Sequence, residues 1–592
     1  MIERTDDRTV SDVPADFTAA FGAGSGMGLV DSGEQLGLEF ASTTMDQTPP
    51  TGACGPSRWC GGSTGGRLTM ERIDPDLLGS DPAAWSSHDT IIRNGKSADG
   101  IALNGTPKAR NSRNYYISQT WQLSSATTLT KAKSPYVITE GGLRVAQGVT
   151  LTVEPGVTVK LFTNTSDLIV DGTIKAIGTA AEPIVFTSFR DDEYGGDTNG
   201  DGAGSAPLAG EWRHIAITGA SRDSEFAYVR VRYGGRWFTG QQIGHALLKV
   251  ENASLTISNS TFERSFQSGI WLINSTSTVA NSTIQENRVD ALSYGILIQG
   301  GAPTIKDNTI SGNTRGVGVE SEATATVSGN TFRENSQEAI AMGGGTPTLS
   351  GNSALGNGIN GVLVGGSLPR DYTFVKGLPY VFEGGLTLPS AKIFRAEPGV
   401  VFKGKGSASA EIDVGGTFTV AGSNAEPVVF TSVRDDEYGG DTNNDGATST
   451  VPAAGDWLTL RFGPTATSSS VSHGLIRYGG AFARAGLHLN GTAFDISDTT
   501  IERNASVGLK LSNATSATST LARLIVRDHQ PTPGSAGATG LLLESGARAV
   551  LSGSMFSANA LGISADASWL TNGGGNSFSG NTMDTFPPGL IP

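Results

Sequence analysis

The sequence predicts an all-β solenoid, a coil in which short parallel strands stack turn upon turn. The 592 residues include 81 glycines and only 17% charged residues, which is a turn-rich β composition. An Asn-Ser/Thr-apolar pattern begins at residues 259, 281, 308, 330 and 352, with a period of 22 residues and one insertion of five near 290–294. A fixed short period is the signature of stacked repeats.

Residues 1–115 lack this period and form a separate predicted domain. Leu103–Ser112 reads LNGTPKARNS and follows other short motifs in an order that resembles the second half of a bacterial lamin-tail domain, with Lys108 and Arg110 departing from its usual pattern. The resemblance implies a partial immunoglobulin-like β-sandwich that serves as an accessory recognition module. Either the start of the chain is truncated, or residues 1–30 complete the sandwich.

From Tyr136 onward, Thr-x-Ile/Phe segments alternate with turns of Gly, Asn and Asp. Alternate side chains of a strand face opposite sides, so each segment can bury one face. We expect three short strands per turn, each paired with its equivalent about 4.8 Å away, and stacked Asn amides that bond from turn to turn. These repeats resemble those of right-handed parallel β-helix proteins of the pectate-lyase-like architecture.

A longer duplication divides this region into two related halves, predicted at 116–378 and 379–592. Motifs of the first half return in the second at offsets of 243 to 245 residues: Tyr136-Val137, Glu154–Val157 and Arg232–Gly235 return as Tyr380-Val381, Glu397–Val400 and Arg477–Gly480. Trp212 and Trp457 also occupy equivalent positions, so we expect both to be core residues.

The longest duplicated motif is acidic. Phe186–Gly202 reads FTSFRDDEYGGDTNGDG and Phe430–Gly446 reads FTSVRDDEYGGDTNNDG, with fifteen of seventeen positions identical. Both blocks contain the D-x-N-x-D-G spacing in which alternate oxygens converge on one hard cation. The bidentate Glu of an EF-hand is missing, because Leu208 and Pro452 occupy its positions. We predict Ca²⁺ at a non-EF-hand loop; the alternative is a solvated turn.

Ligands beyond the D-x-N-x-D-G positions remain open at this point. They can come from Asp191, Asp192 or Glu193 upstream or from Glu211 downstream, and in the second block from Asp435, Asp436, Glu437 or Asp456. The predicted metal ligands are Asp197, Asn199, Asp201, Asp191 and Glu211 in the first block, and Asp441, Asn443, Asp445, Asp435 and Asp456 in the second.

Residues that could carry catalysis form no recognised constellation. Arg232 could act as a lyase base, although its duplication favours a structural role. His214 has no counterpart in the second half, and Arg288 and Asp290 lie beside the five-residue insertion, where solenoids often build binding faces. These four residues are the catalytic candidates.

The net charge and the lengths of the apolar runs limit the kinds of partner that this protein can have. A net charge of −14 argues against a nucleic-acid surface, and no apolar run is long enough to span a membrane. Cys54 and Cys60 fit two thiols or one local disulfide. We expect a non-enzymatic, calcium-stabilised scaffold or adhesin, extracellular or on the cell surface, that contacts polysaccharide or cell-surface components. The alternative is a polysaccharide lyase or glycoside hydrolase.

Overall fold

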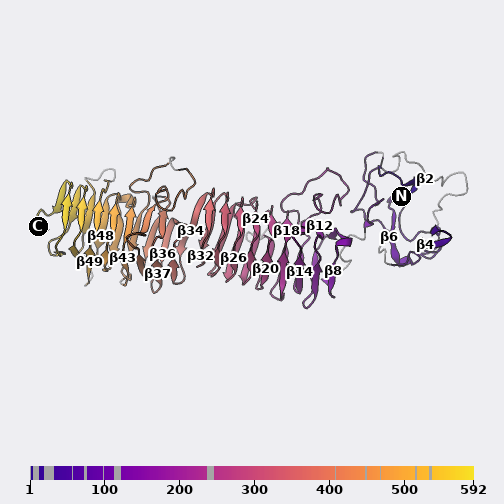
Figure 1. Cartoon of the computed structure of the whole chain (residues 1–592), viewed down its shortest axis with the longest axis horizontal. Helices are drawn as coiled ribbons and strands as arrows, with labels where there is room; N and C mark the ends of the chain where they lie inside the picture. Colours follow the sequence, from indigo (N-terminus) through magenta and orange to yellow (C-terminus); the bar gives the residue numbers. More distant parts are fainter. Residues whose placement is uncertain are drawn as a thin grey trace. The chain divides into compact units, whose positions relative to one another are not determined.

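The computed structural model describes residues 2–3, 12–18, 33–56, 58–63, 65–72, 77–97, 99–112, 122–236, 246–406, 408–446, 450–466, 468–513, 517–531 and 537–591. The chain forms two compact units, Met1–Lys249 with Ser260–Phe266, and Val250–Asn259 with Gln267–Pro592. Within each unit, parallel strands stack as successive rungs of a coil (Figure 1).

The N-terminal part of the first unit contains only short strand pairs among its described residues. They are β1 (Ile2–Glu3) with β2 (Phe17–Thr18), β3 (Gly37–Phe40) with β4 (Thr43–Gln47), and β5 (Met70–Arg72) with β6 (Trp85–Ser87). Cys54 and Cys60 form a disulfide, which was one of the two alternatives. The partial sandwich and the domain boundary at 115 stay predictions.

The coil of the first unit has three parallel sheets. One contains β7 (Gln122–Leu123), β10 (Leu143–Val145), β13 (Leu168–Val170) and β16 (Ile215–Ile217). The next contains β8 (Thr127–Leu129), β11 (Thr150–Val153), β14 (Thr173–Ile177) and β17 (Ser224–Ala227). The third contains β9 (Tyr136–Ile138), β12 (Thr158–Leu161), β15 (Ile184–Ser188), β18 (Val229–Arg232) and β21 (Thr261–Glu263).

The chain leaves the first unit within β19 (Ala246–Glu251), and the second unit opens with the 22-residue repeats. Its rungs form three sheets. The first contains β20 (Leu255–Ser258), β23 (Thr278–Ala280), β26 (Thr304–Lys306), β29 (Thr326–Ser328) and β32 (Thr348–Ser350), and the second contains β24 (Thr283–Gln285), β27 (Thr309–Ser311), β30 (Thr331–Arg333) and β33 (Ser353–Leu355). The third contains β22 (Ser268–Ser275), β25 (Tyr294–Gly301), β28 (Arg315–Glu320), β31 (Glu338–Gly343), β34 (Ile359–Ser367) and β36 (Tyr380–Leu388).

After β36 the second half of the sequence forms its own three columns. One continues from the start of β36: β38 (Val401–Gly404), β41 (Val428–Ser432), β44 (Gly474–Arg477), β47 (Thr500–Glu502), β50 (Ile525–Arg527), β53 (Met555–Ser557) and β56 (Ser577–Ser579). Another continues from its end: β39 (Glu411–Val414), β42 (Thr459–Phe462), β45 (Ala485–Asn490), β48 (Val507–Ser512), β51 (Thr539–Leu543), β54 (Leu561–Ser564) and β57 (Met583–Phe586).

The third column of this half contains β35 (Tyr372–Phe374), β37 (Ile393–Ala396), β40 (Thr417–Ala421), β43 (Ser470–Ser472), β46 (Ile496–Ser497), β49 (Thr518–Ala522), β52 (Arg548–Ser552) and β55 (Leu570–Asn572). The described helices are the 3₁₀ turns η1 (Pro82–Ala84), η3 (Lys131–Lys133) and η4 (Ala481–Ala483). None of the helices in the described ranges is long and apolar enough to cross a membrane.

The core lies inside the coil because each strand turns alternate side chains inward. On β11, Leu151 and Val153 are buried, whereas Thr150 and Thr152 between them are partly exposed. Trp212 and Trp457 are both fully buried, and each indole N–H donates to a main-chain carbonyl one rung away. Their predicted place in the core is confirmed.

Stacked asparagines join consecutive rungs of the second unit. In one column the side-chain amide of Asn313 donates to Asn335 Oδ1 (3.0 Å), and that of Asn335 donates to Asn357 Oδ1 (2.8 Å). Each amide also donates to a main-chain carbonyl, as from Asn335 to Ile310 (3.0 Å). These residues are essentially buried, so the ladder satisfies polar groups that water does not reach. The predicted structural role of the repeated Asn is confirmed.

Replacing one ladder residue tests this role. Asn335→Ala should lower the free energy of unfolding by about 1–3 kcal/mol, because it leaves buried partners of Asn335 without hydrogen bonds. Arg333→Ala, at an exposed position of the same rung, should change it by less than about 0.5 kcal/mol. Urea unfolding measures both, and equal effects would contradict a structural ladder.

Candidate metal sites and their supporting network

Two equivalent loops interrupt the coil, one in each unit. The first leaves β15 after Ser188 and returns at Ile215, the start of β16. The second leaves β41 after Ser432 and returns at Thr459, the start of β42, and its ribbon stands out from the stacked rungs (Figure 1). Each loop therefore starts and ends on a fixed strand, which holds the acidic segment in place.

Three carboxylates converge in each loop. One oxygen each of Asp192, Asp197 and Asp201 lies within 4.8 Å of the other two. Asp436, Asp441 and Asp445 form the same group in the second loop. The structure thus brings together the predicted aspartates of the D-x-N-x-D-G motif and selects the middle acid of each Asp-Asp-Glu run, Asp192 or Asp436, as the third member.

Several oxygens of these groups are buried without a donor. Within the described residues, Asp192 Oδ1, Asn199 Oδ1 and Asp201 Oδ1 have no hydrogen-bond partner. The same holds for Asp436 Oδ1 and Asn443 Oδ1. Burial, together with the neighbouring carboxylate of Asp197, raises the pKa of Asp192. Buried acceptors that lack donors are rare in proteins, and a bound cation is one kind of partner that such oxygens can take.

The backbone of each loop fixes one carboxylate of the group, Asp197 in the first loop and Asp441 in the second. Asp197 accepts the main-chain N–H groups of Asp201 (3.1 Å) and Gly202 (2.7 Å). Asp441 accepts the equivalent N–H groups of Asp445 and Gly446, each at 3.1 Å. These hydrogen bonds hold the carboxylate of Asp197 or Asp441 within the turn.

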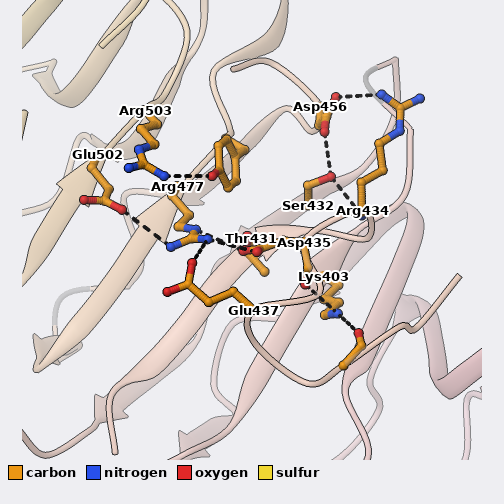
Figure 2. Close-up of polar contacts among 12 residues, drawn as sticks. Lys403, Thr431, Ser432, Arg434, Asp435, Glu437, Asp456, Arg477, Glu502 and Arg503 are labelled. Atoms are coloured by element: carbon orange, nitrogen blue, oxygen red, sulfur yellow. Dashed lines mark hydrogen bonds and ion pairs between the residues drawn. The ribbon is translucent and has the colours of Figure 1, made fainter. Parts of the chain in front are cut away.

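Asp191 and Asp435, which were predicted as metal ligands, point away from these groups toward a buried arginine. Arg477 donates from Nε and Nη2 to the two oxygens of Asp435, both at 2.9 Å (Figure 2). In the first unit, Nε of Arg232 lies 3.6 Å from Asp191 Oδ2. The structure therefore assigns both aspartates to ion pairs, and Asp192 and Asp436 replace them in the carboxylate groups.

Each buried arginine gathers two further acids. Arg477 bonds Glu437 (2.6 Å) and lies 3.6 Å from Glu502 on the next rung (Figure 2). Arg232 likewise bonds Glu193 (2.7 Å) and lies 3.6 Å from Glu263. In each unit, one guanidinium group thus connects the loop, the strand that carries the arginine and the following rung.

The remaining predicted ligands, Glu211 and Asp456, hold the base of the loop. Asp456 accepts the hydroxyl of Ser432 (2.6 Å) and pairs with Arg434 at 3.2 Å (Figure 2). Glu211 pairs in the same way with Ser188 and with Arg190. These acids close the loop where it leaves the strand and are not members of the three-carboxylate groups.

A buried lysine lies under each loop, and the sequence interpretation missed it. Lys403 donates to the main-chain carbonyls of Asp435 (2.9 Å) and Gly440 (2.8 Å), and Lys160 donates to that of Gly196 (2.5 Å). Burial lowers the pKa of each lysine to about 8. The available signal was the duplication itself, since both lysines lie in equivalent strands that precede the acidic blocks.

The four catalytic candidates are divided between the units, with Arg232 and His214 in the first and Arg288 and Asp290 in the second. Arg232 is only 1% exposed and is paired with carboxylates of the loop. His214 is partly buried, and its main-chain carbonyl accepts the N–H of Leu168. Arg288 is exposed, and Asp290 accepts the amide of Gln267 (3.0 Å). The structure gives Arg232 a structural role.

Two family profiles match the coil. A family described as "Pectate-lyase like beta helix domain" matches residues 122–245, and one described as "Right handed beta helix region" matches residues 216–375. The chain therefore contains right-handed β-helix domains of the pectate-lyase-like type. This confirms the predicted fold class of the repeats.

Individual proteins give less information. A curated relative, Protein bark beetle of Drosophila melanogaster, is 35% identical over 83 residues, which are 14% of this chain and 3% of that protein. This chain thus matches only a small part of its length. A solved structure of a mutant PL6 family alginate lyase is 10% identical over 75% of each chain, with a TM-score of 0.22. That score is too low to indicate a shared mechanism.

Removing the buried arginine should unfold the loop base. Arg477→Leu leaves Asp435 buried without a counter-charge, so the free energy of unfolding should fall by about 3–5 kcal/mol. Arg434→Leu breaks the exposed pair with Asp456 and should cost less than about 1 kcal/mol. Urea unfolding distinguishes the two, and similar losses would show that the buried network is not the anchor.

Proposed function

We propose that this protein is a non-enzymatic β-helix scaffold, stabilised by Ca²⁺ at its two duplicated loops, that binds polysaccharide outside the cell or on its surface. The observation that carries the proposal is the repetition of the whole loop environment. Each unit combines three converging carboxylates, buried oxygens without donors, an anchored arginine and a buried lysine. A unique active site would have no reason to occur twice.

Electrostatics favour a cation over an empty turn. Two carboxylates about 4.8 Å apart repel each other by roughly 3–4 kcal/mol at an effective dielectric constant of about 20, and each loop holds three such pairs. One nearby lysine cannot cancel this repulsion, since its own charge is disfavoured by burial. Calcium suits the site because it accepts carboxylate, amide and carbonyl oxygens in flexible geometry.

Polysaccharide is the partner class that the remaining observations support. The pectate-lyase-like profile matches residues 122–245, and long parallel sheets offer an extended polar surface. The net charge of −14 disfavours nucleic acid as an alternative polymer. The Cys54–Cys60 disulfide fits an oxidising location outside the cell.

The alternative function is a polysaccharide lyase or glycoside hydrolase, which the same profile match favours. Glycoside hydrolysis needs two carboxylates at a defined separation beside the scissile bond, and lyase chemistry needs an accessible base. The duplicated arginines and lysines are the basic side chains near the carboxylates that could serve as a catalytic base. Lys160 and Arg232 are only 0% and 1% exposed, so neither side chain is accessible as such a base in this structure. We therefore place the non-enzymatic function first.

Calcium should raise the melting temperature. Ca²⁺ in excess over its Kd should increase it by a few degrees relative to chelator, since binding stabilises the folded state alone. Differential scanning calorimetry should show a smaller increase in Asp197→Ala and in Asp441→Ala, and none in the double variant. Near pH 4.5 the increase should shrink, because the raised pKa values of Asp192 and Asp436 favour protonated carboxyls that do not bind metal.

The control for this experiment is Glu140→Ala, which removes an exposed carboxylate outside both loops. It should keep the full response to calcium. A wild-type melting temperature that is the same in calcium and in chelator would refute the calcium assignment.

A second test concerns catalysis. Incubation with polygalacturonate, alginate and neutral glucans, with and without Ca²⁺, should release neither unsaturated ends that absorb in the ultraviolet nor new reducing ends. Turnover that is lost in a single-residue variant of this chain would establish the enzymatic alternative. Turnover that persists in every variant would point to a contaminating enzyme, which a repurified sample identifies.

A further inference from the structure

One open cavity of the second unit lies outside both loops. It has a volume of about 580 Å³, within the range of small-ligand sites. Strands β25, β28, β31, β34 and β36 form its floor, and its walls combine acids, bases and a phenol. The side chains that matter here are Tyr294, Arg315, Glu338, Leu363, Glu383 and Lys405.

The strand pairing is irregular where β34 and β36 border this cavity. Val364 of β34 pairs with Phe382 of β36, but Gly366 pairs with Leu386, so three residues of β36 face one residue of β34. The extra segment contains Glu383 and Gly384, and Gly384 has a φ of +87°. Such bulges redirect side chains, and here the bulge directs Glu383 to the edge of the cavity.

The floor of the cavity offers both a hydrogen-bond donor and an acceptor. Arg315 donates from Nε to Gln337 (2.8 Å) and from Nη1 to the hydroxyl of Tyr294 (2.9 Å), which fixes its guanidinium. Its Nη2 takes part in neither of these two hydrogen bonds. Glu338, only 3% exposed, lies 3.4 Å from Arg315 and lines the cavity. A hydroxyl group can satisfy such a pair, because it accepts one hydrogen bond and donates another.

The charges that line the cavity balance one another. Arg315 faces Glu338, and Lys405 pairs with Glu383 at 2.9 Å. An anionic ligand would gain one favourable contact for each unfavourable one. The apolar side chain of Leu363 is partly exposed at this cavity and suits the C–H face of a sugar ring, whereas Met342 lies in register with the buried core residues Val319 and Val364.

The wall of this cavity that Lys405 forms has no equivalent in the first half of the sequence, unlike the loops. The position equivalent to Lys405 in the first half is Phe162, which packs against the core cluster of Ile92, Val137 and Phe189 and cannot form an ion pair with an acid. A binding site for a specific ligand needs to be present in only one half. A feature that stabilises the fold is expected in both halves.

We propose that this cavity binds a neutral sugar unit of a polysaccharide, with Arg315 and Glu338 bonded to adjacent hydroxyls and Leu363 beneath the ring. The inference rests on the polysaccharide part of the proposed function and gives it a location and a ligand class. Binding is non-covalent, and the charged calcium loops take no part in it.

Affinity electrophoresis of the full chain tests this proposal. Native gels containing dextran, galactomannan or xyloglucan should retard the wild-type protein in at least one case, and a gel with polygalacturonate should not. Glu338→Gln and Arg315→Met should each raise the Kd for the retarding polysaccharide at least about tenfold, since each removes a charged hydrogen-bond partner.

Two controls keep the result interpretable. Lys405→Met alters an exposed wall residue, so it should fold normally and still weaken binding if the cavity is the site. Arg523→Met breaks an exposed ion pair with Asp498 that does not line the cavity, and it should bind as the wild type does. Melting temperatures report whether each variant folds.

Either of two outcomes would overturn the cavity proposal: no retardation in any of the three neutral gels, or equal retardation of the wild type and of folded Lys405→Met and Glu338→Gln. Stronger retardation by polygalacturonate would also overturn it. Failure of the cavity leaves the calcium-dependent melting temperature intact, whereas failure of the calcium scaffold removes that response whether or not a gel retards the protein.

Discussion

The buried arginine under each acidic loop is the interaction on which the site depends. A guanidinium that is 4% exposed or less must be paired, and three carboxylates from the loop and the next rung surround each one. Asp435 and Glu437 turn toward Arg477, so Asp436 between them turns to the other side and joins Asp441 and Asp445. The arginine thereby selects which acid enters the cation site.

The same selection explains what could and could not be predicted from the sequence. The period of 22 residues and the Asn pattern report packing that recurs in every rung, so the coil and its ladders follow directly. The D-x-N-x-D-G spacing identified Asp197 and Asp201 because their convergence is local. The choice among Asp191, Asp192 and Glu193 depends on Arg232 from a distant strand, which local spacing does not contain.

The second loop also ends a ladder. Asn357 donates to Asn360 (3.0 Å), whose amide and main-chain N–H reach the carbonyls of Asp441 (3.0 Å) and Thr442 (2.8 Å). The backbone that carries the acidic group is thus the last partner of the stacked asparagines. Hydrogen bonds therefore link the backbone of this loop to the asparagine ladder in the adjoining rungs of the second unit. A sequence motif that looks like an independent metal loop is part of the coil's polar framework.

If the duplication encodes two cation sites per chain, the full, chelator-stripped protein should bind two calcium ions in equilibrium dialysis against ⁴⁵Ca²⁺. We expect one bound ion in an Asp441→Ala variant and none when Asp197→Ala is added. Binding of no calcium by the wild-type protein, or binding unchanged in the double variant, would contradict this expectation.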